Sequence, residues 1–288
     1  MIRSMTGFAR AERSGPGGVL TWELRGVNHR YLEVSLRLPE ELRSAEAAFR
    51  QAIGAVARRG KVDGTLSLRP ASADRRGLTL DEALLDRLAE AAASLQRRLG
   101  PSAHIEVGDL LRWPGVVIEP GRDGAPLLAA AQALLDEALA GFSAARTAEG
   151  ERITDLLTGR ATALLQSVDS VASRLPEVQA RIHARLRERL AQLGGEGQPE
   201  RLEQELVILL QKLDVAEELD RLRSHVAELH AALATDAAVG RKLDFLMQEF
   251  NREANTLSSK SQDAETTRVA VEIKVLVEQM REQIQNVE

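Results

Sequence analysis

The residues best suited to chemistry lie in the segment 200–233, where polar side chains recur at helical spacing. Their intervals of three, four and seven residues place them on one stripe of a helix. Carboxylate oxygens are natural ligands for Mg²⁺ or Mn²⁺, and a histidine can bind metal or move protons near neutral pH. The alternative is a solvated face whose charges pair within the helix. The stripe consists of Asp214, Glu217, Glu218, Arg221, His225 and Glu228.

A second polar cluster lies in GRKLDFLMQEFNREANTLSSKS, residues 240–261. Lys242, Glu249 and Glu253 lie at the edge of its apolar face, where we expect them to be only partly exposed. Carboxylates at the edge of a core are well placed for metal binding or a shifted pKa, although they can also be ordinary rim glutamates. The apolar face contains Leu243, Leu246, Met247, Phe250, Ala254 and Leu257, and the opposite face contains Arg241, Asp244, Gln248, Arg252 and Asn255.

Two further polar groups interrupt regular patterns. Asn28, His29 and Arg30 lie at a break between two strands, where they either face a site or satisfy the backbone of a turn. Gly150 lies in a helical segment, where glycine costs about 1 kcal/mol relative to alanine. Close packing, the approach of a substrate or simple tolerance would explain it. The metal-binding spacing HExxH, the P-loop and the GxGxxG motif are absent.

The periodicity predicts an α+β fold. Apolar residues alternate through residues 20–24, 32–38 and 62–68, with a helical pattern over 42–56, so the order is strand, strand, helix, strand. We expect an N-terminal mixed α/β domain with a small sheet at 1–125, a long helical arm at 126–199 and a C-terminal helical domain at 200–288. The predicted helices are 81–99, about 127–157 or on to 174, a new helix from Pro176, then 200–233, 239–257 and 264–286.

The last predicted helix carries an apolar seam like that of a coiled coil. Its members are Val269, Ile273, Leu276, Met280 and Val287. Ordinary packing inside one subunit and a contact between subunits explain this seam equally well.

Composition narrows the class of protein. Of the 288 residues, 44% are hydrophobic and only 3% aromatic, which favours helices packed through leucine, valine, isoleucine and alanine. No cysteine is present, so disulfides and thiolate metal sites are excluded. We see no secretory signal and no stretch near the roughly 18 apolar residues of a membrane span, so we expect a cytoplasmic protein. A net charge of −5 counts mildly against nucleic-acid binding but allows a local basic groove.

Several segments spread along the chain have a distinctive sequence. They are SMTGFAR (4–10), ELRGVNHRYLEVSLRLP (23–39), RGKVD (59–63), LLRWPGV (110–116), TAEG (147–150), RLEQELVILLQKLDVAEELDRLRSHV (201–226), GRKLDFLMQEFNREANTLSSKS (240–261) and EIKVLVEQMREQIQNVE (272–288). Together these segments resemble the YicC/YloC family of bacterial endoribonucleases, also known as stress-induced proteins. The family commonly has glycine where this chain has Ala9 and a leucine-like residue where it has Phe250, and neither change removes a polar group.

The resemblance implies an endoribonuclease that depends on a divalent metal and cuts single-stranded or hairpin RNA. It also implies a homohexamer with a central cavity, with RNA-degradation proteins as further partners. The competing hypotheses are a non-catalytic RNA-binding scaffold that recruits another nuclease, and a protein whose charged stripes form salt bridges between subunits.

Within this framework the chemistry of the side chains suggests a role for each. Glu217, Glu218, Glu249 and Glu253 are candidate metal ligands, with Asp214 as an alternative. His225 and then His29 are candidate acids or bases, alongside the carboxylates of Glu249 and Glu253. Candidate RNA contacts are Asn28, Arg30, Arg221, Lys242, Arg252, Asn255 and Lys260.

Overall fold

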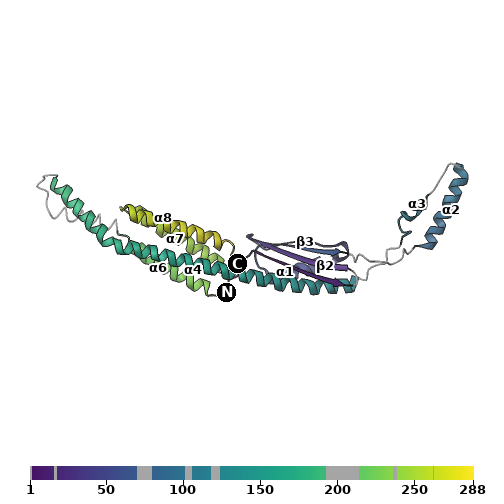
Figure 1. The fold of residues 1–288 in the computed structure, drawn as a ribbon, viewed down its shortest axis with the longest axis horizontal. Coiled ribbons are helices and arrows are strands. Elements are labelled where there is room, and N and C mark those ends of the chain that lie inside the picture. The colour runs from purple at the N-terminus through teal and green to yellow at the C-terminus, as the bar shows by residue number, and fades with distance from the viewer. Residues whose placement is uncertain are drawn as a thin grey trace.

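The structure is a computed structural model. It describes residues 2–15, 18–69, 80–100, 106–117, 124–192, 214–235, 239–261 and 263–288. A small sheet precedes long helices, which confirms the predicted α+β fold (Figure 1). The helices are η1 (Glu40–Ala45), a 3-10 helix, and then α1 (Glu46–Val56), α2 (Glu82–Leu99), α3 (Val107–Leu111), α4 (Gly124–Gln192), α6 (Ala216–Leu233), α7 (Gly240–Lys260) and α8 (Ala264–Ile284).

The sheet has four strands in the order β1-β2-β4-β3. The pairs β1–β2 and β2–β4 are antiparallel, whereas β3 and β4 are parallel and joined through α1. Helices α1 and α4 pack on this sheet. The rings of Trp22 and Phe49 meet edge to face at 5.4 Å, and the Trp22 indole N–H donates to the Ala131 carbonyl of α4 at 3.0 Å. The strands are β1 (Gly7–Gly15), β2 (Gly18–Val27), β3 (Glu33–Arg37) and β4 (Lys61–Arg69).

Strand β1 is absent from the sequence-based prediction. Its buried positions are Ala9 and Ala11, while the large Phe8 is 58% exposed. Small residues are therefore buried and large residues are exposed. The sequence of β1 for this reason lacks the alternation of large apolar and polar residues by which a strand is predicted.

Helix α4 runs without a break from Gly124 to Gln192, with Pro176 inside it. The prediction of a new helix at Pro176 is therefore wrong. Proline removes one helical hydrogen bond, but contacts on both sides of it hold α4 to α8. Arg174 and Arg181 reach the same carboxylate, Asp263, at 2.8 and 3.5 Å.

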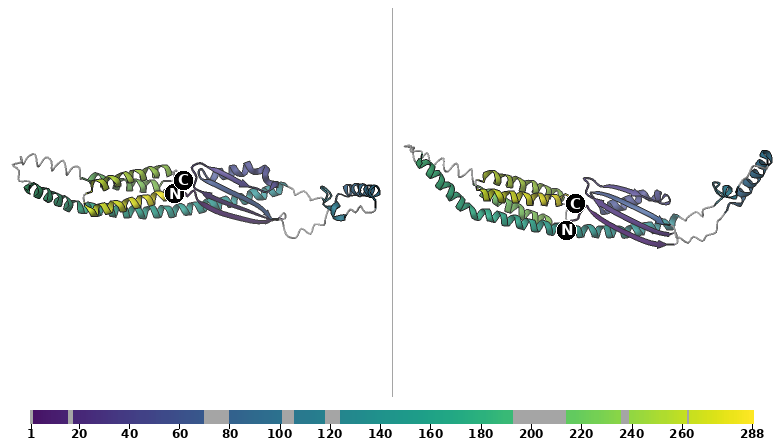
Figure 2. Two further views of the ribbon diagram at one scale, coloured as in Figure 1. Left: turned by 90° about the horizontal axis from the view of Figure 1, so that it is seen from above. Right: turned by 45° about the horizontal axis from the view of Figure 1, so that its top comes forward.

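Helix α4 joins two hydrophobic cores (Figure 2). Near its start, Leu134, Leu135 and Phe142 are buried in the core of the sheet. Farther along, Leu157 and Leu164 are buried in a second core with α6, α7 and α8. One long helix therefore holds the sheet beside a helical bundle. The predicted seam of α8 packs in this second core, inside the chain.

The segment Ala125–Arg185 of α4 is long and apolar enough to cross a membrane by composition, contrary to the expectation from sequence. A single helix of this kind is weak evidence, because a core helix passes the same test. The burial of Leu134 and Leu164 in two different cores gives its apolar residues an alternative explanation.

The two ends of the chain meet beside the middle of α4, at a place called the junction below. Ser4 pairs with Val287, and the Met5 N–H donates to the Asn286 carbonyl at 2.7 Å. Gly150 of α4 faces this pairing, and a Cβ on it would lie 2.1 Å from the Ile2 carbonyl oxygen. Close packing therefore accounts for this glycine.

Candidate metal centre and adjoining groove

The centre of the bundle is built by α6 and α7. On α6, Leu222, Val226 and Leu229 are buried at helical spacing and face the core. His225 lies next to this buried row on the helix surface and is therefore at the edge of the core. On α7, the buried Phe250 places Glu249 and Glu253 at the facing edge. The His225 and Phe250 rings meet edge to face at 5.6 Å.

His225, Glu249 and Glu253 converge on one point. One ligand atom from each lies within 4.8 Å of the others. Both ring nitrogens of His225 are buried and have no hydrogen-bond partner in the described part of the chain. An imidazole always carries at least one N–H donor, so leaving both nitrogens unpaired is costly. A cation bound by a nitrogen lone pair and two carboxylates would offset that cost, and the donor set therefore fits a divalent metal.

Two arginines surround these carboxylates. The Arg221 guanidinium lies 3.3 Å from the Glu253 carboxylate and also forms an ion pair with Glu217. The hydrogen bond to Glu253 raises the pKa of Arg221 above its ordinary value. Arg252 lies 3.8 Å from Glu249. The Glu253 side chain is 3% exposed and that of Glu249 is 24% exposed, so Glu249 is the carboxylate that solvent reaches more easily.

The other members of the α6 stripe lie elsewhere. Glu218 is buried and forms an ion pair with Lys260 at 2.7 Å. The Asp214 carboxylate accepts from the Ala216 N–H at 3.0 Å, and its carbonyl accepts from Lys260 at 2.9 Å. Among the described residues, Asp214, Glu217 and Glu218 are thus outside the convergent set, because the start of α6 faces the end of α7 there.

The residues between β2 and β3 lie beside Arg59, whose backbone N–H donates to the Glu288 carboxylate at the junction. The ring of His29 hydrogen bonds to the Tyr31 carbonyl at 3.0 Å, and the Arg30 guanidinium lies over the Tyr31 ring at 5.2 Å. Arg59 donates to the Arg30 carbonyl at 3.3 Å. His29 is exposed and does not join His225. Asn28 is exposed as well.

Lys242 is exposed in the first turn of α7. It precedes Glu249 by about two helical turns and Glu253 by about three. It therefore lies on the same side of α7 as both carboxylates.

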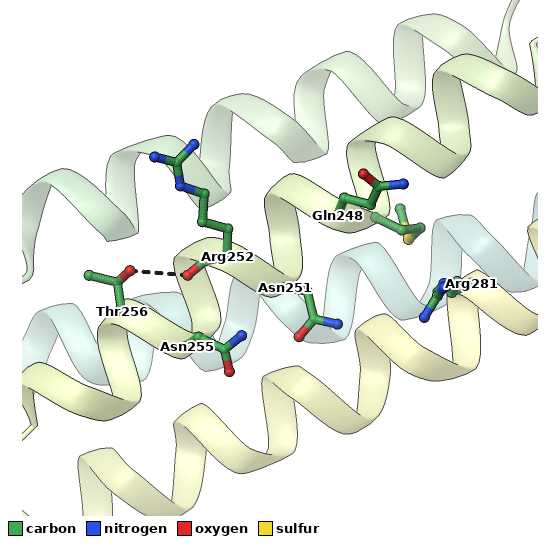
Figure 3. Close-up of a pocket in the computed structure, with 7 residues that line it drawn as sticks. Gln248, Asn251, Arg252, Asn255, Thr256 and Arg281 are labelled. Atoms are coloured by element: carbon green, nitrogen blue, oxygen red, sulfur yellow. Dashed lines mark hydrogen bonds between the residues drawn. The ribbon is translucent and has the colours of Figure 1, made fainter.

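A groove adjoins the convergent set on the other side of α7. It has a volume of about 530 Å³. Asn251 and Asn255 project from α7 on the side of α8, from which Arg281 projects, while Arg252 extends on the side of α6 (Figure 3). The polar lining consists of Gln248, Asn251, Arg252, Asn255, Thr256 and Arg281.

Sequence reasoning did not single out Asn251, Thr256 and Arg281, which line this groove, and it placed Gln248 only on the face opposite the apolar residues. The density of amides in residues 248–255 was the available signal. Arg281 comes from α8, so no local spacing could connect it with α7.

Comparison with known proteins identifies the family. Residues 2–155 match the N-terminal region and residues 171–288 match the C-terminal region of the endoribonuclease YicC-like family. The chain is 43% identical over 291 residues to a Haemophilus influenzae protein named "Probable endoribonuclease YicC". It is 29% identical over 293 residues to a Clostridioides difficile protein with the same name. Each alignment covers 100% of both proteins. The chain therefore belongs to the YicC-like endoribonuclease family.

Proposed function

We propose that this chain is a metal-dependent endoribonuclease that cleaves phosphodiester bonds in single-stranded or hairpin RNA at His225, Glu249 and Glu253. The observation that carries the proposal is the convergence of these three side chains to within 4.8 Å around an imidazole without hydrogen-bond partners. The names of the relatives support the RNA substrate.

The ligand set suggests which cation binds. Two carboxylates are suited to Mg²⁺ or Mn²⁺, whereas an imidazole favours a transition metal. Mn²⁺ is therefore a better fit than Mg²⁺. When bound, such a cation lowers the pKa of a coordinated water and offsets negative charge on the phosphate.

The side chains around the candidate metal centre have distinct roles in this proposal. Arg221 holds the buried Glu253 carboxylate in place through its contact at 3.3 Å. Glu249 is more exposed, so its carboxylate is the better acceptor for the proton of the attacking water. Arg252 lies beside Glu249 and can bind the phosphate as its negative charge grows. Lys260 forms an ion pair with Glu218, so it connects the end of α7 to the start of α6.

The junction supports a path for the rest of the RNA. Arg30 is exposed next to Arg59. The guanidinium of Arg59 also approaches the first residue of α7, since a Cβ on Gly240 would lie 3.9 Å from its Nη1. The exposed Lys242 follows two residues later on α7, on the side of Glu249. Such groups bind the phosphate backbone without reading sequence. We expect their loss to weaken RNA binding uniformly.

Self-association as a homohexamer is part of the proposal and rests on the family resemblance. We also propose a cytoplasmic location, as expected from the sequence. Exposed apolar side chains on α7 and α8, namely Phe245, Val271 and Val275, offer surface for such contacts. Light scattering coupled to size-exclusion chromatography measures the oligomer directly.

The deciding experiment is a cleavage assay on a labelled RNA hairpin with Mn²⁺, with Mg²⁺ and with chelator. Wild-type protein should cut with Mn²⁺, and Glu253→Gln should not. Glu228→Gln is the matched control, because Glu228 is an exposed glutamate on α6. Tight RNA binding without any cutting by the wild type would favour the scaffold. Equal cutting by Glu253→Gln would place the active site elsewhere.

A further inference from the structure

The groove between α7 and α8, called the amide pocket below, has a composition unlike that of the metal centre. Among the residues that the structure describes, its polar lining consists of three amides, two arginines and a threonine, without a carboxylate. It therefore suits a ligand that has both hydrogen-bonding edges and negative charge, and it disfavours a bare cation. A volume of about 530 Å³ lies within the usual range for a pocket that holds a small organic ligand.

The two asparagines supply the hydrogen-bonding groups. Asn251 and Asn255 are one helical turn apart, so their amides project into the pocket side by side (Figure 3). Each amide offers a donor and an acceptor in one plane, which is the arrangement that reads the edge of a nucleobase. Unpaired bases in RNA expose such edges. In an RNA duplex the Watson–Crick edges are paired, and the major groove is too deep and narrow for side chains to read.

The remaining lining gives the pocket an apolar part and one further donor. Met247 lines the pocket and is itself fully buried, so it closes the pocket toward the hydrophobic core. The Nε of Arg281 is buried without a hydrogen-bond partner among the described residues, although its side chain is 42% exposed. An oxygen of a phosphate or base at this position would satisfy it.

The amide pocket and the metal centre share one helix. Glu249 and Glu253 face α6, whereas Asn251 and Asn255 face α8, so the two sites are separated by about one helix diameter, 10–12 Å. Arg252 contributes to both, because it lines the amide pocket and lies 3.8 Å from Glu249. A nucleotide whose base enters the pocket would therefore place its phosphate near Arg252.

We infer that the amide pocket binds one unpaired nucleotide of the RNA and reads the edge of its base, thereby selecting where the strand is cut. This inference rests on the proposed function, since it assigns a recognition site to the same nuclease.

The test measures binding without cleavage. Fluorescence anisotropy with labelled hexanucleotides of adenine, cytosine or uracil, in the presence of chelator, gives the base preference of the wild type. The wild type should prefer one base by about five- to a hundredfold, the discrimination of one bidentate amide–base pair. The double variant Asn251→Ala/Asn255→Ala should bind all three alike, at the affinity of the weakest. Free nucleoside monophosphates as competitors show whether the base suffices or the strand is needed.

The control is Gln285→Ala, which removes an exposed amide at the end of α8 and should leave the preference intact. An unchanged preference in the double variant, with its circular dichroism melt preserved, would overturn the inference. Equal binding of all three bases by the wild type would overturn it too.

The two proposals fail in different ways. Glu253→Gln should keep the base preference while losing cleavage. A protein that never cuts but loses its preference in the double variant would contradict the nuclease and leave the pocket standing. If the protein cuts RNA with Mn²⁺ and the double variant keeps the base preference, the inference about the amide pocket is wrong and the proposed nuclease activity still stands.

Discussion

The guanidinium of Arg146, in the middle of α4, forms an ion pair with the carboxylate of Glu288 inside the junction. Arg146 is 1% exposed, and it also donates to the Ser4 carbonyl at 2.6 Å and to the Val56 carbonyl at 3.2 Å. The other oxygen of Glu288 accepts from the backbone N–H groups of Arg58 and Arg59. Burial, and then repulsion by Arg3, lower the pKa of Arg146. Glu288 therefore links α4 to the end of α1.

Replacing Glu288 by alanine should destabilise the protein strongly. A buried cation left without its partner costs about 3–5 kcal/mol. Urea denaturation at neutral pH measures the loss in the free energy of unfolding. Glu282→Ala is the control, because Glu282 is an exposed glutamate on α8 and should change little. Equal stabilities for both variants would show that the ion pair contributes nothing.

Gly150→Ala should also destabilise the protein, because the new methyl group would lie 2.1 Å from the Ile2 carbonyl oxygen. The backbone of the N-terminal segment would have to move away from α4. Gly159→Ala on the same helix meets nothing within 4 Å, so it should instead stabilise by about 1 kcal/mol. Opposite shifts in melting temperature are the expected result. A stabilised Gly150→Ala protein would contradict the close approach.

The contribution of Asp263 to stability should disappear in acid. The hydrogen bond from Arg174 lowers the pKa of Asp263 from 3.8 to about 2. A lowered pKa in the folded state stabilises the protein above the unfolded pKa, and that stability is lost as the pH falls toward about 2. Asp263→Asn keeps an N-cap for α8 but removes the charge. Its deficit in unfolding free energy should be largest at neutral pH and vanish near pH 2. A deficit independent of pH would contradict this origin.

Mn²⁺ should raise the melting temperature of the wild type through His225. A ligand at a hundred times its dissociation constant stabilises the folded state by about 2.7 kcal/mol. His225→Gln should lose most of this effect. His230→Gln is the control, because His230 is an exposed histidine on the same helix. Equal stabilisation of both variants by Mn²⁺ would remove His225 from the metal site.

Arg221→Lys should reduce cleavage while leaving RNA binding nearly intact. Lysine keeps the charge but cannot form the forked contacts that Arg221 makes with Glu217 and Glu253. The Glu253 carboxylate would then be held less firmly. The expected change is a lower kcat for hairpin cleavage with an unchanged Kd in chelator. Arg223→Lys is the control on the same helix, because Arg223 pairs with Asp169 and Asp220 instead.

The sequence contains enough information to propose His225, Glu249 and Glu253 as candidate site residues. Helical periodicity places Glu249 and Glu253 at the edge of an apolar face and His225 on the polar stripe of its own helix. Periodicity does not determine which stretch of α6 meets which stretch of α7. For that reason the sequence supports Glu217 and Glu218 as metal ligands as well as it supports Glu249. In the structure, Glu217 pairs with Arg221 and Glu218 pairs with Lys260.

The limits of prediction in the fold have similar causes. Strand β1 is hidden because its buried side chains are alanines. The continuity of α4 through Pro176 goes against the local preference of proline. The arginines on either side of Pro176, Arg174 and Arg181, both contact Asp263, which is far away in the sequence, so no local pattern could indicate that contact.

Because α4 is shared by two hydrophobic cores, it fixes both the distance between them and the rotation of one relative to the other about the helix axis. Each residue of an α-helix adds about 1.5 Å of length and about 100° of rotation. One residue inserted in α4 between the sheet and the bundle would therefore rotate the bundle, with the candidate metal centre, by about 100° relative to the sheet. The length of α4 between its two cores thus sets the direction in which His225, Glu249 and Glu253 face relative to the sheet.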